Sequence, residues 1–262
     1  MRVITLLTDF GRSDAYAGVL HGVILRINPH AVVVDLCHEI PAHDVRAAAF
    51  VLFSAYRFFP EDAIHVAVVD PGVGTERRAM AVRTGGGVFI SPDNGLLSRV
   101  LDQERALEMV QLTNPAYWLS PLSSTFHGRD LFASVAAHLS IGVPLSAMGP
   151  GMQKPVLLKC PCAWRDQTGV IHGEVQHVDR FGNLITNIPG AWVEGARGPA
   201  IKVAGEVIRA ILDTYASVAD GTLLALVGSS GFLEIAVRSG SAAERLGVSR
   251  DAPVHVHAQR AG

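Results

Sequence analysis

Strand-like and helix-like segments alternate along the first part of the chain, and this alternation restricts the possible folds more than any other feature. Short apolar runs rich in β-branched residues are typical of buried strands, and apolar residues at helical spacing are typical of helices that cover a sheet. Strands are expected at residues 2–8, 31–36 and 64–69, followed by a hairpin at 80–82 and 88–91. Helices are expected at residues 14–28, 45–58, 96–102 and 130–141. The order predicts an α/β domain with a Rossmann-like, mainly parallel sheet flanked by helices.

The pattern changes after a segment rich in Pro and Gly, Gly149-Pro-Gly-Met-Gln-Lys-Pro155. Beyond it, short strand-like segments are separated by Gly and Asn turns, which is typical of a small antiparallel β-barrel or sandwich. The expected strands are 168–178, 184–188, 200–203, 206–210, 223–227, 232–237 and 253–258. We therefore expect an N-terminal α/β domain at 1–152, a linker at 153–167 and a C-terminal β-barrel domain at 168–262.

Composition excludes several classes of partner. The 262 residues are 49% hydrophobic and 18% charged, with a net charge of −2 and no basic run, so a nucleic-acid partner is not expected. No apolar stretch approaches the ~18–20 residues that a membrane-spanning helix needs, and no secretory signal is recognisable. The three cysteines are odd in number, which favours a reducing compartment, and we expect a cytoplasmic protein.

Reactive polar side chains follow the expected strands. Asp9 comes at the end of the first strand, and Asp70 comes at the end of the strand at 64–69. Arg77 lies seven residues after Asp70 across a Gly-rich turn, and His127 precedes a helical segment. Ligands of parallel sheets gather at the carboxyl ends of the strands. An acid, a guanidinium and an imidazole there could together bind and activate a small molecule such as water.

Each of these residue patterns also has an ordinary structural explanation. Asp9 could be a helix cap or a turn residue, although a strand-end carboxylate can also hold the two hydroxyls of a ribose. The turn that contains Asp179 and Asn183, and the hairpin that contains Ser229 and Glu234, have the residue types of tight turns.

A metal site is not expected from the spacing of ligand-type residues. Four of them lie close together in the sequence, but their separations match no standard metal motif. They are Asp35, His38, His43 and Asp44.

Four segments in the right order are similar to one known family. They are Val69-Asp-Pro-Gly-Val-Gly-Thr-Glu-Arg77, Ser91-Pro-Asp-Asn-Gly-Leu-Leu97, Phe126-His-Gly-Arg-Asp130 and Asp179-Arg-Phe-Gly-Asn-Leu-Ile-Thr-Asn187. Over nearly its whole length the chain resembles the S-adenosyl-L-methionine hydroxide adenosyltransferase family, relatives of the fluorinase and the chlorinase. The resemblance implies an N-terminal α/β domain, a C-terminal β-barrel and a homotrimer, with sites between the N-terminal domain of one subunit and the C-terminal domain of its neighbour.

The resemblance also implies roles for individual residues. Asp70, Arg77 and His127 would handle the water molecule. Asp9 would hold the ribose of the substrate. Asn183 and the backbone near Val237 would recognise adenine, and Tyr215 would stack on it. Ser229 and Glu234, helped by Asp179, would hold the methionine end.

The activity implied is hydrolysis of S-adenosyl-L-methionine at its 5′ carbon, giving adenosine and L-methionine without a cofactor or a metal. Halogenating relatives replace the Asp–Arg–His set, and fluorinases carry a long insertion after the region of Asp70. This chain keeps the set and lacks the insertion. Two other functions stay open, a chlorinase-like halogenase and a protein that binds S-adenosylmethionine or adenosine without turnover.

Overall fold

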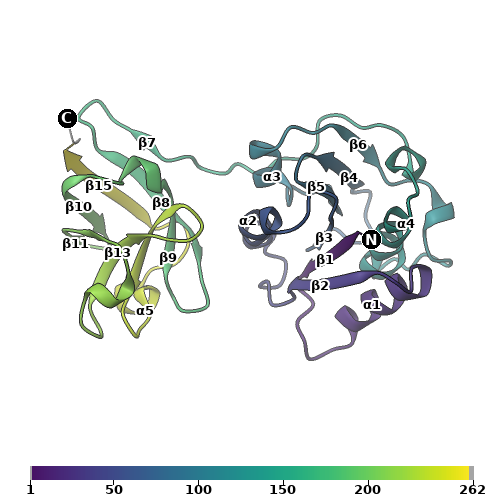
Figure 1. Ribbon diagram of the computed structural model, residues 1–262, viewed down its shortest axis with the longest axis horizontal. Helices are drawn as coiled ribbons and strands as arrows, with labels where there is room; N and C mark the ends of the chain where they lie inside the picture. Colours follow the sequence, from purple (N-terminus) through teal and green to yellow (C-terminus); the bar gives the residue numbers. More distant parts are fainter. Residues whose placement is uncertain (1, 260–262) are drawn as a thin grey trace. The chain divides into compact units, whose positions relative to one another are not determined.

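The computed structural model describes residues 2–259, and the chain divides into two compact units, Met1–Cys160 and Pro161–Gly262 (Figure 1). Each unit has its own apolar core and is described by itself. None of the helices in the described part of the chain is long and apolar enough to cross a bilayer.

Unit 1 is built on a six-stranded sheet in the order β2-β1-β3-β5-β4-β6. The strands are β1 (Val3–Thr8), β2 (Val32–Cys37), β3 (Ile64–Val68), β4 (Ala79–Thr84), β5 (Gly87–Pro92) and β6 (Glu108–Gln111). Neighbours among β2, β1, β3 and β5 are parallel, whereas β4 runs antiparallel to both β5 and β6. The predicted mainly parallel α/β fold and its hairpin are confirmed.

Helices cover both faces of this sheet (Figure 1). One face carries α1 (Tyr16–Ile27) and α4 (Ser134–Ser140), and the other carries α2 (Val45–Ala55) and α3 (Ser98–Gln103). Successive side chains of a strand point to opposite faces. Accordingly, Leu6 packs into the core beneath α1 and α4, whereas Leu7 packs into the core beneath α2.

Three details of unit 1 differ from the sequence-based expectation. The segment at 31–36 was expected to be a buried strand, but β2 is the edge of the sheet and its side chains are half-buried or exposed, because only β1 pairs with it. The helix expected at 130–141 begins with a π-helical turn, η3 (Gly128–Ala133), before α4. The strand β6, only four residues long, was not predicted.

Unit 2 is a curled, open sheet that follows the path β11-β10-β15-β8-β9-β14-β13-β12 around one apolar core, with β7 paired to β8 (Figure 1). Pairing is antiparallel except between β12 and β13, as expected for a small barrel-like domain. The strands are β7 (Trp164–Arg165), β8 (Ile171–Val178), β9 (Leu184–Pro189), β10 (Arg197–Val203), β11 (Glu206–Ile208), β12 (Ile211–Leu212), β13 (Leu223–Val227), β14 (Phe232–Val237) and β15 (Pro253–Gln259).

Short helical elements complete the fold. Sequence patterns did not predict α5 (Ala242–Leu246), which the Ser241 side chain caps by accepting a hydrogen bond from Glu244 N. The 3₁₀ turns are η1 (Tyr56–Phe58), η2 (Pro115–Tyr117), η4 (Leu145–Met148), η5 (Gly190–Trp192) and η6 (Tyr215–Ser217).

The segment predicted as a linker, residues 153–167, spans the division between the units. Its first part is fastened to unit 1, since Val156 N donates to Asp93 Oδ1 over 2.7 Å and Leu158 N donates to Ser98 Oγ over 2.8 Å. Its last part forms β7, which pairs with β8 of unit 2.

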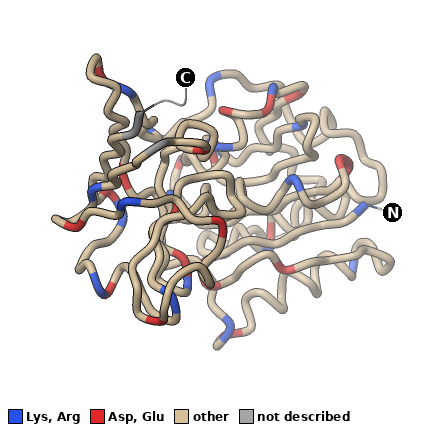
Figure 2. Tube along the Cα trace, turned by 60° about the vertical axis from the view of Figure 1, so that its left-hand side comes forward, with Lys and Arg blue, Asp and Glu red and all other residues tan. Residues whose placement is uncertain are grey.

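Charged residues of both signs are interspersed along the trace of the described chain (Figure 2). Several of them pair locally across short distances, as Arg78 does with Asp93 at 2.5 Å and Arg129 with Asp130 at 2.5 Å.

Two leucines of α1 provide a test of this packing. Leu20 is fully buried, whereas Leu25 is 42% exposed. We expect Leu20→Ala to lower the free energy of unfolding by about 2–5 kcal/mol, because it leaves a cavity in the core, and Leu25→Ala to change it by less than about 0.5 kcal/mol. Both variants change the same residue type on the same helix, so the difference between their free energies of unfolding in urea reports the effect of burial. Equal losses would contradict this packing of α1.

Candidate functional site

The turn after β3 brings two distant segments together. Asp70 follows Val69 at the carboxyl end of β3, and the chain then turns through Gly72 and Gly74. Gly74 has a φ of +78°, and a Cβ there would lie 2.3 Å from the carbonyl oxygen of Ser124. Only glycine permits so close an approach. This contact places the turn that carries Arg77 against the loop that leads to His127.

Arg77 forms a forked ion pair with Asp70. Its Nε lies 2.9 Å from Asp70 Oδ1 and 3.0 Å from Oδ2, and its Nη2 lies 2.5 Å from Oδ2. The two side chains are only 12% and 6% exposed, respectively. The guanidinium also lies over the ring of Phe132, 5.4 Å from its centroid, which is a favourable cation–π arrangement. The guanidinium is thus fixed by charge on one side and by an aromatic face on another.

His127 joins this pair through Arg77. Arg77 Nη2 donates to His127 Nδ1 over 2.7 Å. A guanidinium is a donor only, so Nδ1 must be unprotonated and the neutral ring carries its proton on Nε2. Burial, and then the charge of Arg77, lower the pKa of His127 below its usual 6.5, although Asp70, Asp130 and a hydrogen bond to the Ser123 backbone act in the opposite direction. The site therefore combines a carboxylate, a guanidinium and a neutral imidazole.

Asp9 lies at the same edge of the sheet as Asp70. It follows Thr8, the last residue of β1, which pairs in register with Val68 of the adjacent parallel strand β3. Asp9 Oδ2 accepts a hydrogen bond from the backbone N–H of His43 at 2.8 Å. The backbone bond orients the carboxylate at the sheet edge where ligands of such folds gather.

Three aromatic rings that sequence reasoning did not select pack beside these residues. The ring centroids of Phe10, Tyr16 and Phe126 lie 5.2–5.9 Å apart in tilted or edge-to-face contacts. Phe10 adjoins Asp9 in the sequence, and Phe126 adjoins His127. The trio therefore links the two loops that carry polar site residues.

In unit 2, Asp179 and Asn183 form one turn. Asp179 Oδ1 accepts from the backbone N–H groups of Phe181 and Asn183, both at 2.9 Å, and its Oδ2 accepts from the Asn183 side-chain amide at 2.9 Å. Asp179 thus holds the turn and orients the largely buried amide of Asn183.

Glu234 and Tyr215 form a second polar pair in unit 2. Tyr215 donates its hydroxyl hydrogen to Glu234 Oε1 over 2.5 Å. Burial and the charge of Asp179 raise the pKa of Glu234, and burial and the Glu234 carboxylate raise the pKa of Tyr215. Glu234 is only 5% exposed, whereas Tyr215 is 43% exposed and could offer its ring to a ligand.

The hairpin before β14 carries two serines with different environments. Ser229, which the sequence singled out, is exposed, whereas the neighbouring Ser230 has a buried Oγ with no hydrogen-bond partner in the described chain. A buried hydroxyl without a partner is a better candidate for a ligand contact than an exposed one. Val237, at the end of β14, is buried in the core of unit 2, so only its backbone is suited to recognise a ligand.

Comparison with known proteins identifies the family of the chain. Residues 4–149 match the SAM hydroxide adenosyltransferase N-terminal domain, and residues 173–255 match the SAM hydroxide adenosyltransferase C-terminal domain. The chain belongs to this family. A relative named (R)-S-adenosyl-L-methionine hydrolase from Thermus thermophilus is 40% identical, over 98% of this chain and 100% of the relative.

Other relatives are similar in fold or more distant in sequence. A crystal structure of a protein from Thermotoga maritima aligns with a TM-score of 0.91 and 36% identity, covering 97% of this chain and 99% of that one. A fluorinase from an Actinoplanes species is 28% identical over 71% of this chain and 71% of the relative.

Proposed function

We propose that this protein hydrolyses S-adenosyl-L-methionine at the 5′ carbon, giving adenosine and L-methionine. The observation that carries the proposal is the position of Arg77, which is hydrogen-bonded to both Asp70 and His127. The full-length similarity to the hydrolase of Thermus thermophilus supports the same reaction. The name of that relative specifies the (R) form of the substrate, and we extend this preference to the present chain.

The chemistry explains why such a site suffices. Attack of water on the 5′ carbon breaks the bond between carbon and sulfur, and the electron pair of that bond stays on sulfur. The leaving group is a neutral thioether, so the reaction needs no general acid. The attacking water must lose one proton, and its other proton remains on the new 5′-hydroxyl of adenosine. The site has only to position the water and to accept one proton.

We assign these tasks to the residues around Arg77. The permanently charged guanidinium stabilises the hydroxide character that develops on the water. Asp70 accepts the proton, because its carboxylate oxygens have acceptor capacity beyond the bonds to Arg77. His127 cannot accept at Nδ1 while Arg77 donates to it, so the imidazole holds the guanidinium in place and is not the base. A water already attacking carbon is acidic, and a carboxylate is a sufficient base for it.

The remaining residues bind the substrate in this proposal. In unit 1, Asp9 holds the ribose hydroxyls. In unit 2, Asn183 and the backbone near Val237 recognise adenine and the ring of Tyr215 stacks on it. Glu234 attracts the ammonium group of the methionine end together with Ser229, and Asp179 helps by orienting Asn183. Ser230, whose buried hydroxyl has no hydrogen-bond partner among the described residues, joins this group.

We further propose a homotrimer with its sites at subunit interfaces, located in the cytoplasm. The family resemblance supports the trimer, and the odd number of cysteines, three, supports a reducing compartment.

A halogenase is the second candidate, because fluorinases are more distant relatives of this chain. Retention of Asp70, Arg77 and His127 favours water over halide as the nucleophile.

Product analysis in labelled water tests the main proposal. The purified full-length protein, given S-adenosyl-L-methionine in ¹⁸O-water, should release adenosine with the label in its 5′-hydroxyl, detected by mass spectrometry, and the (R) form should react faster than the (S) form. Asp70→Asn keeps the shape of the side chain but removes the charge, and we expect it to turn over about 10²–10⁴-fold more slowly.

Two results would replace the proposal. Halogenated adenosine formed in the presence of chloride or fluoride would identify a halogenase. Equal substrate binding by wild type and Asp70→Asn, with no product from either, would identify a binding protein without turnover.

The pH profile tests the protonation state of His127. Protonation would remove the acceptor for Arg77 and place a second positive charge beside it. Because the pKa of His127 is lowered, the neutral ring persists below pH 6.5, and kcat/KM should fall only at lower pH, with a midpoint below 6.5. The His127→Gln variant should have a lower kcat/KM, and its kcat/KM should no longer show this decrease at low pH. An identical decrease in both proteins would assign it to another group.

Complementation tests the proposed assembly. Light scattering should give three times the 27.8 kDa of one chain. Asp70→Asn changes unit 1 and Glu234→Ala changes unit 2. If each site uses unit 1 of one subunit and unit 2 of another, some sites in assemblies of the two co-expressed variants carry neither change, so these assemblies should regain part of the activity. A monomeric mass, or no gain of activity in mixed assemblies, would refute shared sites.

A further inference from the structure

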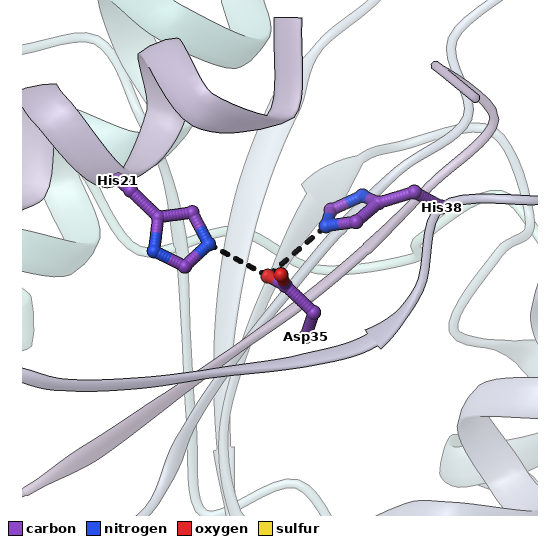
Figure 3. A group of neighbouring side chains, drawn as sticks. All are labelled: His21, Asp35 and His38. Carbon is purple, nitrogen blue, oxygen red and sulfur yellow. Dashed lines mark hydrogen bonds and ion pairs between the residues drawn. The ribbon is translucent and has the colours of Figure 1, made fainter. Parts of the chain in front are cut away.

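A second cluster of reactive side chains lies near the edge of the unit 1 sheet, outside the group around Arg77. It consists of His21 on α1, Asp35 on β2 and His38 just after β2 (Figure 3). One donor atom from each residue lies within 4.8 Å of the others. His21 Nε2 is 2.7 Å and His38 Nε2 is 3.0 Å from Asp35 Oδ1, so both rings converge on one carboxylate oxygen.

The environment of His38 is unusual. Its side chain is 3% exposed, and its buried Nε2 has no hydrogen-bond partner with suitable geometry in the described chain. Its other nitrogen, Nδ1, lies 2.8 Å from Thr8 Oγ1. When Nδ1–H donates to that oxygen, the lone pair of Nε2 faces the carboxylate of Asp35. In this tautomer two acceptors face each other at 3.0 Å, and a cation between them would satisfy both, whereas in the other tautomer Nε2–H itself faces the carboxylate.

We propose that His21 Nε2, Asp35 Oδ1 and His38 Nε2 bind a divalent transition-metal ion of the zinc type. Two imidazoles and one carboxylate are a common three-ligand set for zinc, with water in the fourth position, whereas magnesium and calcium prefer oxygen ligands. Tetrahedral zinc with bonds of about 2.0–2.1 Å needs ligand atoms about 3.3 Å apart. The two distances to Asp35 Oδ1, 2.7 and 3.0 Å, would have to lengthen by a few tenths of an ångström, and the two histidine nitrogens, which lie within 4.8 Å of each other, would have to reach the same spacing.

The proposed ion would have a positioning role. It would fasten α1 to the edge strand β2, which has a neighbouring strand on one side only. The hydrogen bond between His38 and Thr8 is the kind of outer contact that orients a metal-bound imidazole. Thr8 immediately precedes Asp9, and Thr8 Oγ1 also accepts from Phe10 N at 3.2 Å. The ion would thus stabilise the backbone that presents Asp9, without taking part in the chemistry around Arg77.

Zinc titration of the full-length protein tests the site. After treatment with a chelator, the protein should bind one Zn²⁺ tightly in competition with a chromophoric chelator, and its melting temperature should rise. Co²⁺ should give the visible absorption of a four-coordinate site. His21→Gln retains an amide that can donate to Asp35 but removes the ligand nitrogen, and it should weaken zinc binding more than about 100-fold. Thr8→Val should weaken it about 10-fold.

The matched control is His30→Gln, which changes an exposed histidine of the same unit and should bind zinc as wild type does. Absence of zinc binding at micromolar concentration would show that a proton, and not a metal, links the three side chains. Unchanged binding in His21→Gln would place the zinc at other histidines, such as the pair His172 and His255 in unit 2. Either result overturns the proposal. Both measurements are independent of turnover, so they do not depend on the proposed hydrolysis.

Discussion

The group around Arg77 depends on one permanent positive charge. A guanidinium does not lose its proton at accessible pH, so it determines the charge of what it touches. It pairs with Asp70 as a carboxylate, and its donation to His127 Nδ1 selects one neutral tautomer of the ring. The rest of unit 1 makes this placement possible. Gly74 allows the close approach to Ser124, and Phe132 supports the guanidinium from its face.

The two units present opposite kinds of chemistry. Unit 1 combines the cationic Arg77 with neutral and anionic partners near the carboxyl edge of a parallel sheet. The candidate residues of unit 2 are a buried carboxylate with a raised pKa, a tyrosine that donates to it and an amide oriented by Asp179. In the proposed function, the residues assigned to the ribose and the water lie in unit 1, and those assigned to adenine and the methionine end lie in unit 2.

Edge position explains why the histidine cluster can exist. A strand in the middle of this sheet has neighbours on both sides, as β3 has, and its side chains are buried. The strand β2 has one neighbour, so Asp35 remains partly exposed and can meet His21 from α1. The spacing of ligands along the chain gave no indication of this, because His21 lies fourteen residues from Asp35 on a separate element.

Most elements of the fold could be predicted from the sequence, because strand and helix periodicity are local properties. The alternation in unit 1, the hairpin of β4 and β5, and most strands of unit 2 follow from it. Short or irregular elements could not be predicted in this way. The strands β6 and β12 and the π-helical turn η3 contain too few residues to show a period, and tertiary packing selects them.

By itself, the sequence determined the type of fold, the family, and the residue types available for chemistry. Only the tertiary structure decided which of these residues meet. Arg77 and His127 are 50 positions apart, and no local pattern reports the 2.7 Å contact between them. The edge position of β2, the meeting of His38 with Asp35 and the buried hydroxyl of Ser230, which has no hydrogen-bond partner among the described residues, are likewise consequences of packing in space. Periodicity is set by neighbours along the chain, whereas a site is set by neighbours in space.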